Sequence, residues 1–288
     1  MSRPGSVIET VAVVGVGLIG GSFALALKKA GFTGRILGVS SPKTIEKALA
    51  AGAIDDAAPL EQALAAADLV YLAQPVLGIL EQLPEVARLA RPEALVTDAG
   101  STKAAIVALA QEVFDPPQRF LGGHPMAGKE GRGVENSDPS LFQNAVYALT
   151  PGDSTLPSTP IVTEFVNWVG EIGARPEVFN AQRHDEIAAW TSHLPQLLAS
   201  VLASAISAEI PSERELSLAG GGLRDMTRLA ESPFAVWKGV FSTNRAAILH
   251  SLDRYMDVLS GLRAKFDNET LEKRFEEGER FRKQLRET

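Results

Sequence analysis

Hydrophobic and polar positions alternate differently in the two halves of this chain. Before Leu149, short apolar runs are separated by segments of helical periodicity, a rhythm typical of a parallel sheet covered by helices on both faces. Strands are predicted at residues 11–14, 35–39, 69–73, 95–98, 120–122 and 145–149, with residues 175–178 as a candidate last strand. After Asn180 the strand pattern disappears. The pattern therefore predicts an α/β domain followed by an all-helical one.

The helical half opens with a long apolar-periodic segment, residues 181–210, which Pro195 interrupts. Proline has no backbone N–H, so we expect a kink there, beside His193. Residues 244–285 predict one or two long helices with charged residues between the apolar positions. We place the two domains at residues 1–173 and 174–288.

Three glycines, Gly15, Gly17 and Gly20, follow the first predicted strand and precede a predicted helix. Glycines at this spacing, between a strand and a helix, are typical of a dinucleotide-binding turn. The first glycine allows the tight turn, the second lets the backbone approach a pyrophosphate, and the third allows close packing of helix and strand. We therefore expect a Rossmann-like fold that binds NAD or NADP. Further cofactor contacts are expected from Leu18, Ile19, Gln74, Pro75 and Ser101.

The end of the second predicted strand bears on the choice of cofactor. An acidic residue at this place favours NAD by bonding the ribose 2′-hydroxyl, but the chain has Ser40, Ser41 and Lys43 there. Hydroxyls and a lysine would admit a 2′-phosphate, so NADP is admissible. An equally good interpretation is that this segment only caps a helix.

Two polar segments follow predicted strands at the edge where open α/β sheets bind ligands. The first, residues 97–103, contains Ser101, which either lies beside a cofactor or caps the next helix. The second, residues 122–133, is rich in glycine and contains His124. Oxidation of an alcohol needs a base for the hydroxyl proton, and neutral imidazole is suited to this near pH 7.

Six segments occur in the order found in the prephenate and arogenate dehydrogenase family, which the chain resembles from about residue 11 to 262. They are GVGLIGGS (15–22), DAGSTK (98–103), HPMAGKE (124–130) with LFQNAVYALTP (141–151), RHDEIAAWTSHLP (183–195), GGGLRDMTRLAESPFAVW (220–237) and NRAAILHSLDRY (244–255). The resemblance implies oxidation of a 4-hydroxycyclohexadienyl acid with loss of its ring carboxylate, in tyrosine biosynthesis. No metal is required, because aromatisation of the ring drives the loss of carbon dioxide.

The resemblance also implies roles for individual residues. It makes His124 the partner of the substrate hydroxyl, Ser101 its neighbour and Arg224 the arginine that binds a carboxylate. It places His184, His193 and Trp237 around the pocket.

The chain departs from the family at two positions that face the substrate side chain. Gln196 stands where many members have histidine, and Lys129 where many have serine or threonine. A glutamine amide can both donate and accept, so we expect activity on prephenate and arogenate, with a slight preference for arogenate.

Two other functions are compatible with a Rossmann-like domain joined to helices. One is a β-hydroxyacid dehydrogenase, which would normally use a lysine on the long helix; residues 181–210 contain none. The other is a protein that binds NAD(P) as a redox sensor without turnover.

Composition narrows the classes of partner. The formal charge of −7 is spread along the 288 residues without a basic run, which makes nucleic acid an unexpected partner. There is no cysteine, no apolar signal core and no stretch long enough to span a membrane, so we expect a cytoplasmic protein. Long apolar stripes in the helical half predict a homodimer.

Overall fold

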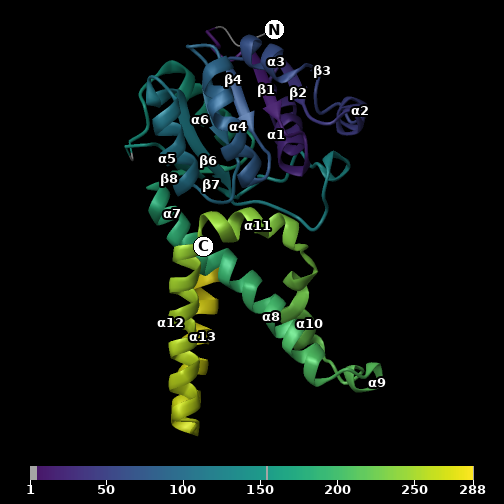
Figure 1. Cartoon of the computed structure of the whole chain (residues 1–288), viewed down its shortest axis with the longest axis vertical. Coiled ribbons are helices and arrows are strands. Elements are labelled where there is room, and N and C mark those ends of the chain that lie inside the picture. Colours follow the sequence, from purple (N-terminus) through teal and green to yellow (C-terminus); the bar gives the residue numbers. More distant parts are fainter. Residues whose placement is uncertain (1–4, 154, 288) are drawn as a thin grey trace.

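The computed structural model describes residues 5–153 and 155–287. A sheet flanked by helices, from β1 to β8 and called the nucleotide domain below, occupies one end of the molecule (Figure 1). Helices alone, from α7 (Ala181–Ala188) onward and called the helical half, form the other end. The strands are β1 (Thr10–Val14), β2 (Arg35–Val39), β3 (Asp56–Ala57), β4 (Leu69–Leu72), β5 (Leu95–Asp98), β6 (Phe120–Pro125), β7 (Val146–Thr150) and β8 (Arg175–Val178). Within the described residues they form an eight-stranded sheet in the order β3-β2-β1-β4-β5-β6-β7-β8. The order reverses at β1, which is the arrangement of a Rossmann-like domain.

Helices cover both faces of this sheet. They are α1 (Leu18–Lys29), α2 (Pro42–Ala50), α3 (Leu60–Ala66), α4 (Val76–Leu89), α5 (Ala104–Val113) and α6 (Pro160–Glu171), with short 3-10 turns η1 (Pro117–Arg119) and η2 (Val134–Asn136). Side chains alternate across a strand, so Val11 and Val13 join the core with α1 and α6, while Ala12 and Val14 join the core with α3, α4 and α5. Burial on both faces explains why the strands read as continuous apolar runs.

The sheet differs from the sequence-based expectation in three respects, the first being the two-residue strand β3, which the pattern did not predict. Strand β6 extends to Pro125, so His124 lies within the strand rather than in the loop after it. Strand β7 runs antiparallel to β6, with Ala148 opposite His124. The candidate last strand at residues 175–178 is confirmed as β8, which pairs in parallel with β7. The glycine-rich character of residues 120–125 hid the length of β6, because a strand pattern depends on bulky side chains.

The helical half begins at α7 (Ala181–Ala188) and continues through a π-helical turn, η3 (Ala189–His193), into α8 (Leu194–Glu209). Pro195 lies in the first turn of α8, where its missing N–H is tolerated. The expected kink therefore occurs just before Pro195, as a wider turn that contains His193.

The remaining helices are α9 (Glu213–Leu216), α10 (Gly221–Thr227), η4 (Arg228–Glu231), α11 (Phe234–Thr243), α12 (Arg245–Ala264) and α13 (Asn268–Glu287). Helices α8 and α10 diverge from α12 and α13 as two arms that extend away from the sheet, while α11 lies beneath it (Figure 1). Residues 5–153 and 155–287 contain no helix that combines the length and apolar character needed to cross a bilayer.

Candidate active site

A buried ion pair joins the ends of β5 and β6. The Lys103 ammonium, fully buried, donates to the Asp98 carboxylate and, at 2.7 Å, to the carbonyl of Gly123. Asp98 in turn accepts from the backbone N–H groups of Gly100 at 2.8 Å and Gly123 at 3.1 Å. Burial lowers the pKa of Lys103, and the Asp98 charge opposes that shift. The pair fixes the backbone on both sides of Gly123, directly before His124.

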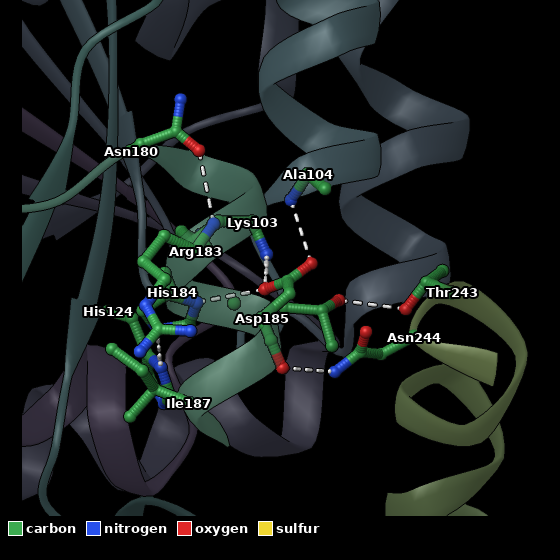
Figure 2. Close-up of polar contacts among 12 residues, drawn as sticks. Lys103, Ala104, His124, Asn180, Arg183, His184, Asp185, Ile187, Thr243 and Asn244 are labelled. Carbon is green, nitrogen blue, oxygen red and sulfur yellow. Dashed lines mark hydrogen bonds and ion pairs between the residues drawn. The ribbon is translucent and has the colours of Figure 1, made fainter. Parts of the chain in front are cut away.

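A chain of hydrogen bonds runs from His124 through His184 to Asp185 (Figure 2). The His124 Nδ1 atom lies 2.9 Å from His184 Nε2, and His184 Nδ1 lies 2.8 Å from Asp185 Oδ1. The Asp185 carboxylate also accepts from the backbone N–H groups of Lys103 at 2.7 Å and Ala104 at 2.9 Å, where α5 begins. One side chain of α7 thus caps a helix of the nucleotide domain and orients the histidine pair.

The tautomers of the two histidines follow from the acceptor at the end of this chain. Because a carboxylate accepts, His184 Nδ1 carries the proton that faces Asp185, and His184 Nε2 is left as an acceptor. His124 then donates its Nδ1–H to His184, and its own Nε2 keeps a free lone pair. That is the form in which a histidine can take a proton from a substrate.

The surroundings keep His124 neutral. Burial, followed by the charges of His184, Lys103 and His193, lowers the pKa of His124 well below its usual value of 6.5. Burial also lowers the pKa of His193 to about 4. The Asn244 amide nitrogen donates to the Asp185 carbonyl at 2.7 Å and lies 3.1 Å from His193 Nδ1, which must therefore accept.

A cavity of about 880 Å³ lies between the carboxyl edge of the sheet and the helical half. Among the described residues its lining includes, from the nucleotide domain, Leu18, Ile19, Ala73 to Val76, Ala99 to Ser101 and Gly128 to Gly133. From the helical half it includes Gln196, Arg228, Leu229, Glu231 to Pro233, Ala235 to Trp237 and Val240. Most of its surface is apolar, with Lys129, Arg132 and Arg228 as the cations.

The structure brings most of the sequence-predicted residues to this cavity. Ser101, Lys129, Gln196 and Trp237 line it, as do the expected cofactor contacts Leu18, Ile19, Gln74 and Pro75. His124 lies beyond the lining residues and is partly exposed, while His184 and His193 are buried behind it. The ring of His193 packs edge-on against that of Trp237, with centroids 6.2 Å apart.

Arg224 is not among the residues that line the cavity. It lies on the exposed α10 helix and is outside the lining set, whereas Arg228, four residues later, belongs to it. Arg228 also forms an ion pair with Glu130 at 3.2 Å, which connects the helical half to the segment after β6. The cavity wall thus contains Arg228, whereas the resemblance implied Arg224. Both lie in the same motif, and one helical turn separates them.

The glycine turn has the shape that a dinucleotide requires. Gly15 has φ of +94°, and a Cβ there would meet the backbone of Ala73 at 2.9 Å. A Cβ on Gly17 would meet no atom within 4 Å, so the space before α1 is open to a pyrophosphate. No side chain caps α1, which leaves its first N–H groups to an anion. These residues fit a nicotinamide dinucleotide, with Gly20 packing closely against Gly15 and Val13.

At the end of β2, Ser41 caps α2 by accepting from the Thr44 N–H at 3.4 Å. Ser40 and Lys43 are exposed, and Ser40, Ser41 and Lys43 lie outside the cavity lining. The helix-capping interpretation of this segment is confirmed for Ser41, and it does not exclude contact with a ribose.

Asp98, Lys103 and Arg228 of this site were not assigned a role from the sequence, and neither were Asp185 and Asn244. Both belong to motifs quoted above, and both are polar residues that the structure buries, Asp185 at 1% and Asn244 at 5% exposure. A sequence does not show which polar positions are buried, so membership of a family motif was the one feature that could have pointed to these residues. Across residues 5–153 and 155–287, no cluster of three or more histidine and carboxylate side chains is arranged to hold a metal ion.

Comparison with known proteins identifies the family. Residues 23–178 match the family model "Prephenate dehydrogenase, nucleotide-binding domain", and residues 180–286 match "Prephenate dehydrogenase, dimerization domain". A prephenate dehydrogenase of Lactococcus lactis subsp. cremoris is 34% identical over 285 residues, which are 96% of this chain and 78% of the relative.

Solved structures agree with this. The prephenate dehydrogenase of A. aeolicus, in complex with hydroxyphenyl propionate and NAD+, superposes with a TM-score of 0.87 at 28% identity, covering 98% of this chain and 99% of that one. The arogenate dehydrogenase of Synechocystis gives 0.79 at 30% identity, covering 96% and 99%. The chain therefore belongs to the prephenate dehydrogenase family and is a nicotinamide-dependent dehydrogenase.

Proposed function

We propose that this enzyme oxidises and decarboxylates prephenate or arogenate, and that neutral His124 is the base for the ring hydroxyl. The observation that supports this role most directly is the hydrogen-bond chain from Asp185 through His184, which leaves His124 Nε2 as an acceptor. His124 lies just beyond the residues that line the cavity. Catalytic hydrogen bonds commonly reach their final length only in the complex with substrate, and we expect the same of the bond between His124 and the substrate hydroxyl.

The proposed reaction needs positioning and one proton transfer from the protein. A nicotinamide dinucleotide bound at the glycine turn would supply the acceptor for the hydride that leaves ring carbon 4. The hydroxyl proton passes to His124 Nε2, and the new carbonyl draws in the electrons of the bond between ring carbon 1 and its carboxylate. Carbon dioxide leaves, the ring becomes aromatic, and the resulting phenolate oxygen takes the proton back from His124, giving hydroxyphenylpyruvate from prephenate or tyrosine from arogenate. Ser101, on the cavity wall beside Gly100, is the neighbour that helps to orient the hydroxyl.

Arg228 is the side chain that we assign to a substrate carboxylate, in place of Arg224. Among the three cations on the cavity wall, Arg228 is the one contributed by the helical half. A guanidinium can bind a carboxylate through two parallel hydrogen bonds, which fixes orientation as well as position. Its pairing with Glu130 is exposed to solvent on both sides, so substrate can replace it at small cost.

Gln196 supports a preference for arogenate. Its amide nitrogen donates to the Leu229 carbonyl at 2.8 Å and to the Ser200 hydroxyl at 3.3 Å, which engages both of its hydrogens. The Leu229 carbonyl can only accept, so the orientation of the amide is fixed. The oxygen Oε1 is left for the substrate, and it can accept from the ammonium of arogenate but cannot donate to the ketone of prephenate. A positive charge at Lys129 would favour the more anionic prephenate. Asp138, whose carboxylate lies 3.6 Å from the Lys129 ammonium, partly neutralises that charge and so weakens the opposing effect.

The cofactor is NAD or NADP, held at the glycine turn by Gly15, Gly17 and the first turn of α1. The hydroxyls of Ser40 and Ser41 and the ammonium of Lys43, at the end of β2, can accompany either a ribose hydroxyl or a 2′-phosphate.

We also infer that the enzyme is a homodimer that pairs through its helical half. Apolar side chains remain exposed along the arms, among them Val201 of α8, Met256 and Leu259 of α12, and Phe275 and Phe281 of α13. Phe275 is 79% exposed, which is unfavourable for a large apolar side chain unless a partner covers it. The division into domains at residue 173 and the cytoplasmic location stay predictions from the sequence.

The proposed reaction is tested by adding prephenate or arogenate to the purified protein with NAD+ or NADP+. Appearance of reduced nicotinamide, together with release of carbon dioxide, supports it. Binding of the dinucleotide without turnover on either substrate would favour the redox-sensing alternative.

A further inference from the structure

The segment between β6 and β7 folds back over the nucleotide-binding turn. The Ser137 hydroxyl lies 3.4 Å from the carbonyls of Gly17 and Leu18, and the Asp138 N–H donates to the Ser22 hydroxyl at 2.9 Å. A Cβ on Gly21 would collide with Ser137, so α1 and this segment are in direct contact. Residues 133–138 thus form a wall beside the glycine turn and the first turns of α1, although they are far from them in sequence.

Glu135 projects from this wall toward α2. Its carboxylate pairs with the Lys47 ammonium at 2.8 Å. The hydrogen bond from Lys47 lowers the pKa of Glu135, and the charges of Lys47 and Lys43 lower it further. Lys43 follows the Ser40 and Ser41 pair at the end of β2, and Lys47 lies one turn further along the helix. The side chains of Glu135 and Lys47 are 51% and 43% exposed, so a bound group can reach both.

We propose that Glu135 is a specificity-determining residue that lowers the affinity for NADP relative to NAD. In a Rossmann-like domain the ribose next to the adenine lies over the end of β2, where an acidic residue selects NAD. Here β2 ends without an acid. Lys43 and Lys47 follow it on α2, and Glu135 interacts with both of them. Glu135, in the segment between β6 and β7, supplies the negative charge that the end of β2 lacks. It repels a 2′-phosphate and neutralises the Lys47 charge that would attract one.

This inference rests on the proposed dinucleotide site but not on the proposed reaction. It concerns only the group that distinguishes NADP from NAD, at the opposite end of the cofactor from the nicotinamide. Removal of one like charge near a doubly charged phosphate in solvent predicts a change of about fivefold in affinity.

Two substitutions that break the same ion pair separate this role from a structural one. Binding of NAD+ and NADP+ to the purified protein is titrated calorimetrically without substrate. We expect Glu135→Gln to tighten NADP+ relative to NAD+ by about fivefold, and Lys47→Gln to weaken NADP+ relative to NAD+. If the pair mattered only for packing, both variants would change the ratio in the same direction.

The matched control is Glu46→Gln, which removes the same charge from the exposed surface of α2. It is expected to leave the ratio unchanged. An unchanged ratio in Glu135→Gln, an equal shift in Glu46→Gln, or shifts of one sign in Glu135→Gln and Lys47→Gln would each overturn the inference. Oxidation of prephenate or arogenate is measured separately, so failure of the proposed reaction is distinguishable from failure of this proposal.

Discussion

The Nδ1 atom of His124, from strand β6 of the nucleotide domain, lies 2.9 Å from the Nε2 atom of His184, from helix α7 of the helical half. This contact places the proton of His124 on Nδ1 and keeps Nε2 as the acceptor. The two rings meet nearly edge to face, with centroids 5.1 Å apart. A substrate between the two halves of the molecule therefore meets a base whose orientation depends on both of them.

Replacement of His124 by asparagine should preserve folding and cofactor binding. Asparagine can still donate toward His184 but cannot take a proton, so turnover should fall by about 100-fold or more. Steady-state kinetics, with a dinucleotide titration as the control for the site, measure this. Turnover equal to that of the wild type would remove His124 from the mechanism.

The role of His184 is tested by a pair of substitutions. In His184→Leu no group accepts from His124 Nδ1, so the required tautomer is no longer favoured, and kcat should fall by about tenfold. Glutamine offers an acceptor toward His124 and a donor toward Asp185, so His184→Gln should recover most of the activity. If the two variants have the same kcat, at equal thermal stability, the hydrogen bond does not position the base.

The lowered pKa of His124 predicts the acid side of the pH profile. The neutral form is the active one, so activity is retained above the pKa and lost as the pH falls through it. Because that pKa lies well below 6.5, kcat/KM should be nearly constant from about pH 8 down to about pH 6. A loss of half the activity near pH 6.5 would mean that His124 titrates like a histidine in water.

Arg228→Ala should raise the KM for substrate by about tenfold or more, because a charge-assisted hydrogen bond to a carboxylate is lost. Arg224→Ala is the matched control one helical turn away, and its KM should stay near that of the wild type. The opposite result, with the larger effect at Arg224, would restore the role that the sequence resemblance implied for it. Arg228→Lys should recover only part of the affinity, since lysine cannot bind a carboxylate through a planar fork.

Gln196→His should shift the ratio of kcat/KM values toward prephenate. An imidazole can donate to the side-chain ketone, and its protonated form repels the ammonium of arogenate. The measurement is the ratio for the two substrates in wild type and variant at one pH. The proposal that Gln196 faces the side chain fails if that ratio does not move.

The sequence alone predicted the two-part architecture of this protein and the glycine turn that follows its first strand. Parallel strands buried on both faces must be apolar throughout, and a pyrophosphate turn must contain glycine, so β1, β2 and β5 and the turn at Gly15 and Gly17 were predictable. The prediction failed where those constraints were absent: the glycine-rich β6 runs further than expected, and the two-residue β3 was not predicted.

Only the tertiary structure decided how residues distant in sequence act together. His124 and His184 are 60 positions apart, and Lys103 and Asp185 are 82 apart, yet each pair is in hydrogen-bond contact. The difference between Arg224 and Arg228 was likewise beyond the sequence, because one helical turn determines which side chain faces a cavity formed by two domains. Periodicity is a local property of a chain, whereas an active site is a set of long-range contacts, and these depend on how the two halves pack.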